Sequence, residues 1–125
     1  MSNPYDDVWD FHTAFDLTRS KAPALPTSDI RKLRASLLLE EFNEYQKAEA
    51  EDDIVEIADA LADIVYIAYG TAIAYGIPLD RVFDEVHRSN MAKLVDGKAV
   101  RREDGKVLKP ASWNPPDILG VLNGK

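Results

Sequence analysis

The chain has 125 residues, 46% of them apolar, and its 15 lysines and arginines against 22 aspartates and glutamates give a formal charge of −7. This size predicts one globular domain over residues 1–125, and the absence of cysteine excludes disulfides, cysteine-ligated zinc and a cysteine nucleophile. An acidic chain is poorly suited to nucleic acid, and its longest uncharged stretch, residues 64–79, is shorter than the roughly 20 residues of a membrane span. With no signal-peptide pattern at its start, we expect a cytoplasmic protein without nucleic-acid or membrane partners.

Apolar periodicity and capping residues predict four helices. The first has Asn3 as its N-cap and Pro4 at its first position, and the third stops at Gly76, because glycine favours the left-handed turn after a helix. The expected bounds are Pro4 to about Arg19, Thr27 or Ser28 to about Ala50, Asp52 or Asp53 to just before Gly76, and Leu79 or Asp80 to about Leu94.

The sequence after the fourth helix is less regular. The pair Asp104-Gly105, with valines on both sides, is typical of a two-residue turn and predicts a short β-hairpin over Ala99–Leu108. The tail beyond it is expected to be mostly irregular and to pack through Trp113 and Ile118. The predicted fold class is therefore all-α: a bundle of four to five helices with a short C-terminal β-hairpin.

Acidic and basic residues are separated along the chain. Residues 40–63 contain ten acids and a single base, Lys47, whereas residues 87–109 contain seven bases and three acids. A protein with this distribution can hold cations in one place and phosphate anions in another.

The third predicted helix carries an acidic stripe. Its residues from Ile54 to Tyr69 are almost all apolar except Glu56, Asp59 and Asp63, whose i, i+3, i+7 spacing places them on one face. A helix that is apolar on its other sides is enclosed by protein. The acidic face therefore either borders a thin strip of solvent or lines an internal cleft.

The second predicted helix carries a matching stripe, Glu40, Glu41 and Glu44, on a face that is apolar two turns earlier. A short connection makes the two helices antiparallel neighbours, so the stripes can face each other. Facing carboxylates repel or take up protons, and Lys47 alone cannot neutralise them. A solvated acidic face is the alternative, but Mg²⁺ or Mn²⁺, which take oxygen ligands, fit the pattern better.

These residues resemble a known signature. Glu40-Glu41-Phe42-Asn43-Glu44 followed by Glu56-Ile57-Ala58-Asp59 reads E-E-x-x-E and then E-x-x-D, which is similar to the all-α nucleoside triphosphate pyrophosphohydrolases. That superfamily includes MazG, dimeric dUTPases and phosphoribosyl-ATP pyrophosphohydrolase. The resemblance continues through residues 86–93 and 102–110 and covers residues 11–118. It is strongest to the MazG-like proteins related to dimeric dUTPases.

The resemblance implies Mg²⁺-dependent cleavage of a (deoxy)nucleoside triphosphate, such as dUTP, to the monophosphate and pyrophosphate. By position it implies that Glu40 binds a further metal or orients the attacking water, that four carboxylates are metal ligands (Glu41, Glu44, Glu56, Asp59) and that Asn90 and Lys93 hold the phosphates. The residues themselves suggest further roles: Glu40 as the proton acceptor, Lys106 and Lys109 as phosphate contacts or as solvated lysines, Asp63 as an outer carboxylate or a hydrogen-bond partner of Asn90 or Lys93, and His12 as a base contact or a structural histidine. The short spacer between the two acidic motifs leaves base specificity open.

Two other functions are compatible with the sequence, and the apolar residues also predict an oligomer. One alternative is a phosphoribosyl-ATP pyrophosphohydrolase, and the other is a non-catalytic nucleotide-sensing dimer of the same fold. The third and fourth helices carry more apolar residues than one small unit can cover, which predicts a homodimer or a dimer of dimers. The residues on which this expectation rests are Ile64, Ile67, Tyr69, Ile73 and Tyr75.

Overall fold

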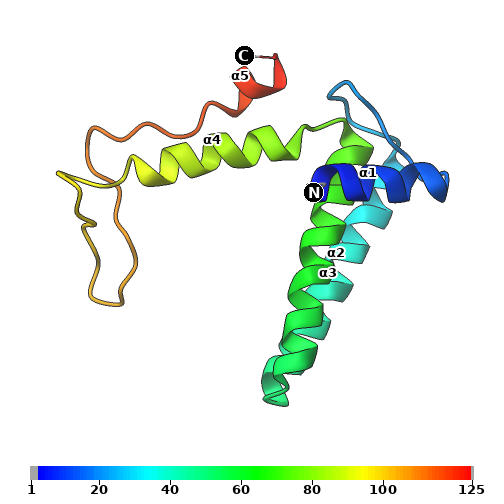
Figure 1. Ribbon diagram of the computed structural model, residues 1–125, viewed down its shortest axis with the longest axis horizontal. Coiled ribbons are helices and arrows are strands. Elements are labelled where there is room, and N and C mark those ends of the chain that lie inside the picture. Colours follow the sequence, from blue (N-terminus) through cyan, green and yellow to red (C-terminus); the bar gives the residue numbers. More distant parts are fainter. Residues whose placement is uncertain (1–2, 125) are drawn as a thin grey trace. The chain divides into compact units, whose positions relative to one another are not determined.

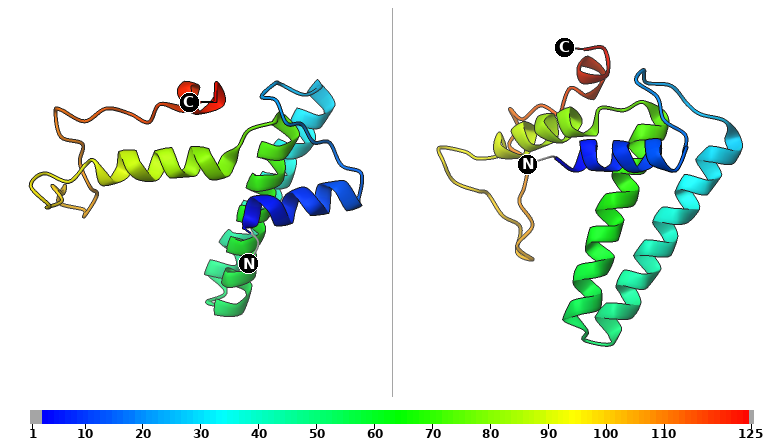
Figure 2. Two further views of the ribbon diagram at one scale, coloured as in Figure 1. Left: turned by 45° about the horizontal axis from the view of Figure 1, so that its top comes forward. Right: turned by 45° about the vertical axis from the view of Figure 1, so that its right-hand side comes forward.

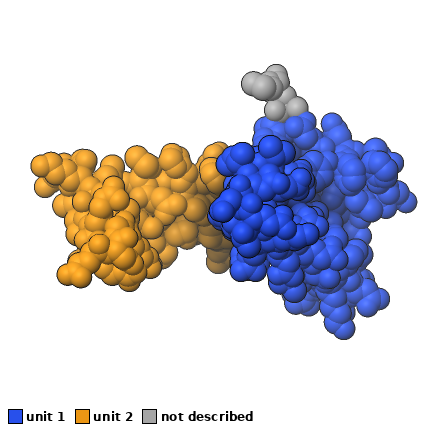
Figure 3. Space-filling model, turned by 90° about the horizontal axis from the view of Figure 1, so that it is seen from below, with its two compact units in different colours: residues 1–79 blue, residues 80–125 orange. Residues whose placement is uncertain are grey.

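The computed structural model describes residues 3–124, and this part of the chain contains five helices and no β-sheet (Figure 1). The helices are α1 (Pro4–Ala14), α2 (Ser28–Ala50), α3 (Ile54–Tyr75), α4 (Leu79–Met91) and α5 (Ile118–Leu122). The chain divides into two compact units, residues 1–79 and residues 80–125 (Figure 3). The all-α prediction is confirmed.

The first unit is built on a helical hairpin. Helices α2 and α3 run antiparallel and side by side, and α1 crosses them near the end where α2 begins and α3 ends (Figures 1 and 2). The buried apolar residues are few and mostly small: Val8, Ala48, Ala60, Ala72, Ile73 and Ala74. Alanines between two helices allow their backbones to approach closely, so the hairpin is a narrow seam rather than a broad core.

Three helices of this unit end in the same left-handed turn. Asp16, Asp52 and Gly76, with φ of 52°, 53° and 69°, each follow a helix. After α1, the Leu17 N–H donates to the His12 carbonyl at 2.8 Å, which closes the helix with a Schellman motif. The prediction that the first helix reaches Arg19 is therefore wrong.

The ends of α2 and α3 agree with the sequence. The Asp53 side chain accepts hydrogen bonds from the Val55 and Glu56 N–H groups at 3.1 and 3.2 Å, so it is the N-cap of α3. Only Asp52 separates it from Glu51, the C-cap of α2. Asn3 caps α1 as predicted, by accepting from the Asp6 N–H at 2.9 Å.

A buried arginine ties α2 to α3. Arg34 is 7% exposed, and it donates from Nε to the Thr71 hydroxyl and from Nη2 to the Ile67 carbonyl, both at 3.1 Å. None of the ion pairs among residues 3–124 includes Arg34. Neutral oxygens on α3 therefore balance its buried charge, which makes these two hydrogen bonds costly to lose.

His12 of α1 is buried beside Arg34. Its Nδ1 donates to the Thr18 carbonyl at 2.8 Å, which fixes the neutral tautomer with an unprotonated Nε2. Burial, followed by the positive charges of Arg34 and Arg19, lowers the pKa of His12, although the Thr18 bond acts in the opposite direction. Gly70 leaves room for both groups, because a Cβ there would lie 2.8 Å from His12 Nε2 and closer still to Arg34 Nη2.

The prediction of a β-hairpin over residues 99–108 is wrong, because the described residues of this segment form no strands. The described residues of this segment hold one isolated antiparallel bridge, between Arg101 and Val107, around a three-residue loop. The loop is closed by the Arg102 N–H donating to the Lys106 carbonyl at 2.8 Å. An isolated pair of short strands has too little apolar contact to be stable, and both valines of the segment are exposed.

The tight two-residue turn lies elsewhere, at Asp96-Gly97, where both residues have positive φ and the Val95 and Lys98 backbones exchange hydrogen bonds. Helix α4 ends at Met91, three residues before the predicted end. The tail packs through Trp113 as predicted, since its Nε1 donates to the Ser89 carbonyl at 2.6 Å.

Ile118 begins the short helix α5, which the sequence reading treated as part of an irregular tail. The Asp117 side chain accepts from the Gly120 N–H at 3.0 Å, and the Asp117 N–H donates to Glu85 Oε2 of α4 at 2.7 Å. Hydrogen bonds from Arg88 and then from Asp117 lower the pKa of Glu85 to about 2. The tail is thus tied to α4 at two places.

We predict that Gly70→Ala destabilises the protein by about 2 kcal/mol, because the new methyl group displaces Arg34 and His12. Helix propensity alone would stabilise the variant by about 1 kcal/mol, so the sign separates packing from propensity. Urea unfolding measures the difference. In an Arg34→Met background the same substitution should cost less, and equal costs in both backgrounds would contradict this account.

Candidate metal centre

Three carboxylates meet at the seam between α2 and α3. One oxygen each from Glu41, Glu44 and Asp63 lies within 4.8 Å of the others. Glu41 and Glu44 are three residues apart on α2, so they share a face, and Asp63 lies opposite them on the antiparallel α3. The two stripes predicted from the sequence therefore do face each other at this point.

The environment of these carboxylates disfavours negative charge. Burial, and then the negative charges of Glu44 and Asp63, raise the pKa of Glu41. Burial, and then the charges of Asp59 and Glu44, raise the pKa of Asp63. The Glu41 Oε2 atom is buried and finds no hydrogen-bond partner among residues 3–124. A buried acceptor without a donor is destabilising, and a cation at this point would satisfy it.

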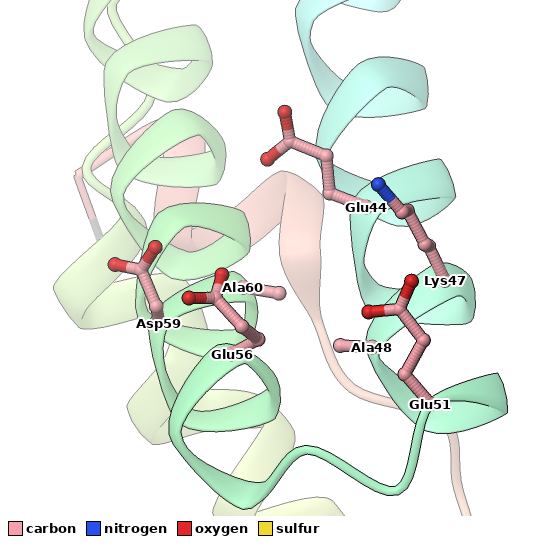
Figure 4. Close-up of a pocket in the computed structure, with 7 residues that line it drawn as sticks. All are labelled: Glu44, Lys47, Ala48, Glu51, Glu56, Asp59 and Ala60. Atoms are coloured by element: carbon pink, nitrogen blue, oxygen red, sulfur yellow. The ribbon is translucent and has the colours of Figure 1, made fainter.

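A cleft of about 320 Å³ extends along the same seam toward the turn between the helices (Figure 4). Two alanines, Ala48 and Ala60, line it together with side chains from both helices: Glu44, Lys47 and Glu51 of α2, and Glu56 and Asp59 of α3. Glu44 belongs both to this cleft and to the cluster with Glu41 and Asp63. Carboxylates thus form one row along the seam.

The structure places the predicted ligands at different points of this row. Glu41 and Glu44 are in the cluster, whereas Glu56 and Asp59 line the cleft. Glu56 lies seven residues before Asp63, about two helical turns or roughly 10 Å along α3, so one ion cannot contact both. Asp63, expected only as an outer carboxylate, stands directly in the cluster. The i, i+7 spacing of Glu56 and Asp63 had placed Asp63 on the same helical face as the predicted ligands, and this was the feature of the sequence that could have identified it as one.

Glu40 is exposed on α2 and is outside the cluster, although its charge contributes to the raised pKa of Glu41. His12 is buried, and its Nδ1 is engaged with the Thr18 carbonyl. Arg34, beside it, is a residue that the sequence reading did not single out.

The predicted phosphate contacts all lie in the second unit. Lys93 and Lys109 come together over the ring of Trp113, with Nζ at 5.4 and 5.0 Å from its centroid. Asn90 is exposed on α4, and Lys106 follows Gly105 in the loop. Two of the four predicted residues are therefore neighbours in space.

The arrangement in the first unit suits a hard divalent cation. Mg²⁺ and Mn²⁺ prefer carboxylate oxygens and keep water molecules that phosphate oxygens can replace. The cluster offers three carboxylates with a fourth, Asp59, close enough to raise the pKa of Asp63 by its charge. The unpartnered Glu41 oxygen supplies an observation of this structure that fits a bound metal.

Comparison with known proteins agrees with this chemistry. Residues 8–90 match the phosphoribosyl-ATP pyrophosphohydrolase family, so the chain belongs to this family of the MazG-like all-α pyrophosphohydrolase superfamily. The chain is also similar to the uncharacterized protein L479 of Acanthamoeba polyphaga mimivirus, with 45% identity over 49 residues. That match covers 39% of this chain and spans only a fifth of the relative.

The length and apolar composition of helix α3 fit two kinds of helix. It has 22 residues and a hydropathy of 1.5, which by length and composition would allow a membrane span, and it is the one described helix with this property. The core helix of a soluble protein passes the same test. In this chain 28% of the apolar window is buried within the described residues.

We predict that Asp63→Asn raises the melting temperature of the metal-free protein at neutral pH, because it removes repulsion within the cluster. The same variant should lose the increase in melting temperature that Mg²⁺ or Mn²⁺ gives the wild type. Thermal unfolding with EDTA and with each metal tests both effects. The exposed Glu103→Gln removes an equal charge elsewhere and should change neither. A full metal response in Asp63→Asn would contradict the assignment.

The raised pKa values also predict how the metal-free protein responds to pH. Because Glu41 and Asp63 bind protons more tightly when folded, their carboxyls contribute stability at low pH that is lost as pH rises through the folded pKa. The lowered pKa of His12 acts in the opposite direction as pH falls through 6.5, so the test is a difference between variants. As pH is lowered with EDTA present, the melting temperature of the wild type should gain more, or lose less, than that of Asp63→Asn. The carboxyl of Glu85, whose folded pKa is about 2, loses its stabilising effect only as pH falls toward the ordinary value of 4.5, so the comparison is made above about pH 5.

Proposed function

We propose that this chain is a divalent-metal-dependent nucleotide pyrophosphohydrolase that cleaves (d)NTP, such as dUTP, between the α and β phosphates. The observation that carries the proposal is the buried, unpartnered oxygen of Glu41 within a three-carboxylate cluster. Family membership supports a hydrolase of phosphoanhydride bonds. Mg²⁺ as the resident metal, a role in nucleotide-pool sanitation or regulation, and a cytoplasmic location belong to the same proposal.

The metal ligands in this proposal follow the row of carboxylates. Glu41, Glu44 and Asp63 would hold one cation, and Glu44, Asp59 and Glu56 would hold a second at the cleft. Bound metal would neutralise phosphate charge and lower the pKa of a bound water. Glu56 thus keeps the ligand role expected from the sequence, and Asp63 gains one.

The reaction assigns a role to Glu40. A water oxygen attacks the α-phosphorus, the bond from that phosphorus to the bridging oxygen breaks, and pyrophosphate leaves with the electron pair. Glu40 accepts the proton that the water loses; it is exposed and one residue from the cluster. Asn90, Lys93, Lys106 and Lys109 would contact phosphate oxygens, as expected from the sequence.

A second substrate has a specific observation in its favour. The matched family is described by phosphoribosyl-ATP pyrophosphohydrolase, whose substrate contains the same α–β phosphoanhydride. The metal chemistry would be identical, so only the binding of the rest of the substrate distinguishes the two. A nucleotide-sensing dimer without activity is the remaining alternative, although sensing has no chemical need for the complete row of carboxylates.

Activity on a substrate panel tests the proposal. We expect pyrophosphate, and no orthophosphate, from at least one of dUTP, the other dNTPs, the NTPs and phosphoribosyl-ATP in the presence of Mg²⁺ or Mn²⁺. Glu41→Gln and Asp63→Asn should each lower kcat by about 100-fold or more, because they remove charge where the phosphates are neutralised. Glu103→Gln is the matched control. Turnover close to wild type in both site variants would refute the ligand assignment, and no turnover on any substrate would favour the sensing dimer.

We also propose a homodimer, or a dimer of dimers, from the exposed apolar surface of the first unit. Leu61 and Val65 of α3 are each about half exposed, at 49% and 50%, and Leu39 of α2 is 59% exposed. The surface differs from the one expected, because Ile73 is fully buried within the chain, and Ile64, Ile67, Tyr69 and Tyr75 are partly buried. Exposed apolar side chains on both helices of the hairpin favour a contact with a second copy of the chain.

Light scattering at micromolar concentration should give at least twice the 14.0 kDa mass of one chain. The double substitution Leu61→Lys and Val65→Lys should lower that mass, because charged side chains cannot be buried at an apolar interface without a partner. Gln46→Lys, at an exposed polar position of α2, is the control and should leave the mass unchanged. A wild-type mass of 14.0 kDa would contradict the dimer.

A further inference from the structure

Two lysines of the second unit lie against one tryptophan ring. Lys93 is the second residue after α4, and Lys109 follows the three-residue loop of the 99–108 segment. Their Nζ atoms are 5.4 and 5.0 Å from the centroid of the Trp113 ring. Both distances are within the range of cation–π attraction. Two lysines 16 positions apart in sequence thus place their charges against the same ring, with their Nζ atoms no more than 10.4 Å apart.

The ring itself is held firmly. Trp113 Nε1 donates to the Ser89 carbonyl at 2.6 Å, and the Ser89 hydroxyl donates to the Asn114 carbonyl at 3.3 Å. Ser89 is 1% exposed, so these bonds are shielded from water. The Trp113 N–H also donates to the Pro110 carbonyl at 3.0 Å, which fixes the backbone next to Lys109. The Trp113 ring is therefore held in a fixed position against α4.

The two ammonium groups are not neutralised nearby. The ion pairs of the second unit, within the described residues, join Arg88 to Glu85 and Arg102 to Asp104, and none uses Lys93 or Lys109. Two unpaired positive charges repel each other. Attraction of each ammonium group to the ring offsets this repulsion and leaves both groups available to an anion.

We propose that Trp113 is a positioning residue that holds Lys93 and Lys109 together as one binding site for a multiply charged phosphate anion such as pyrophosphate. The identity of the anion rests on the proposed function, since cleavage would release pyrophosphate. The convergence of the lysines rests only on the geometry of the second unit. Trp113 lies outside residues 8–90, so family membership does not assign it this role.

Binding of inorganic pyrophosphate to the full chain in EDTA tests the proposal, with calorimetry as the measurement. Metal-free conditions suppress binding at the carboxylates of the first unit, which then repel the anion. Lys93→Gln and Lys109→Gln should each weaken binding. Trp113→Leu should weaken it about fivefold, the loss expected when both cation–π contacts disappear. Trp113→Phe keeps an aromatic ring and should retain most of the affinity.

The chain offers a matched control. Trp9 of the first unit also has a lysine over its ring, with Lys21 Nζ at 3.9 Å from the centroid. Trp9→Leu therefore removes the same kind of contact elsewhere and should leave pyrophosphate binding unchanged. Ring-current shifts of the Lys93 and Lys109 ε-CH₂ signals in NMR spectra should disappear in Trp113→Leu and persist in Trp113→Phe. This signature reports position directly, and a role for Trp113 in tail packing alone would not require it.

Unchanged pyrophosphate affinity in Trp113→Leu, or in both lysine variants, would overturn the proposal and leave the lysines as ordinary surface residues. If Trp113→Leu loosens the tail, as circular dichroism would show, Trp113→Phe decides: retained affinity supports the proposal, and a loss as large as in the leucine variant overturns it. Asp63→Asn should bind pyrophosphate normally in EDTA. A chain that binds pyrophosphate but hydrolyses nothing would refute the proposed function alone.

Discussion

Mutual repulsion of the carboxylates along the α2–α3 seam is the constraint on which the first unit depends. Glu41, Glu44 and Asp63 approach within 4.8 Å of one another in surroundings that raise the pKa of Glu41 and of Asp63. The opposite end of the same hairpin offsets this repulsion. There Arg34 ties α2 to α3, and Ile73 is completely buried. One end of the seam thus supplies stability, and the other end holds charge ready for a cation.

How far the sequence could predict the fold depended on how each helix ends. Asn3 and Gly76 are standard caps, and the bounds that relied on them agree with the structure. Asp16 takes the left-handed conformation that usually identifies a glycine, so the end of α1 had no visible signal. The hairpin failed for another reason, because turn residues specify a turn while strands need apolar cover that this segment lacks.

The composition of the candidate site was predictable, whereas its register was not. Helical spacing places Glu56, Asp59 and Asp63 on one face, but it does not say which of them meets Glu41. That choice depends on the turn between the helices, where a left-handed Asp52 is followed at once by the N-cap Asp53. The pairing of Lys93 with Lys109 was similarly hidden, because the indole that joins them lies in the tail.

The same turn restricts how this protein can change in evolution. A single residue, Asp52, stands between the C-cap of α2 and the N-cap of α3, so the connection has no slack to absorb an added residue. An insertion within α3 just after its cap would rotate the rest of that helix by about 100°, which would carry Asp63 away from Glu41. Insertions between the two acidic motifs are therefore tolerable only when they add whole helical turns or replace the present turn with a longer loop. Related proteins should accordingly differ in the length of this connection by whole turns or by whole loops, and not by single residues.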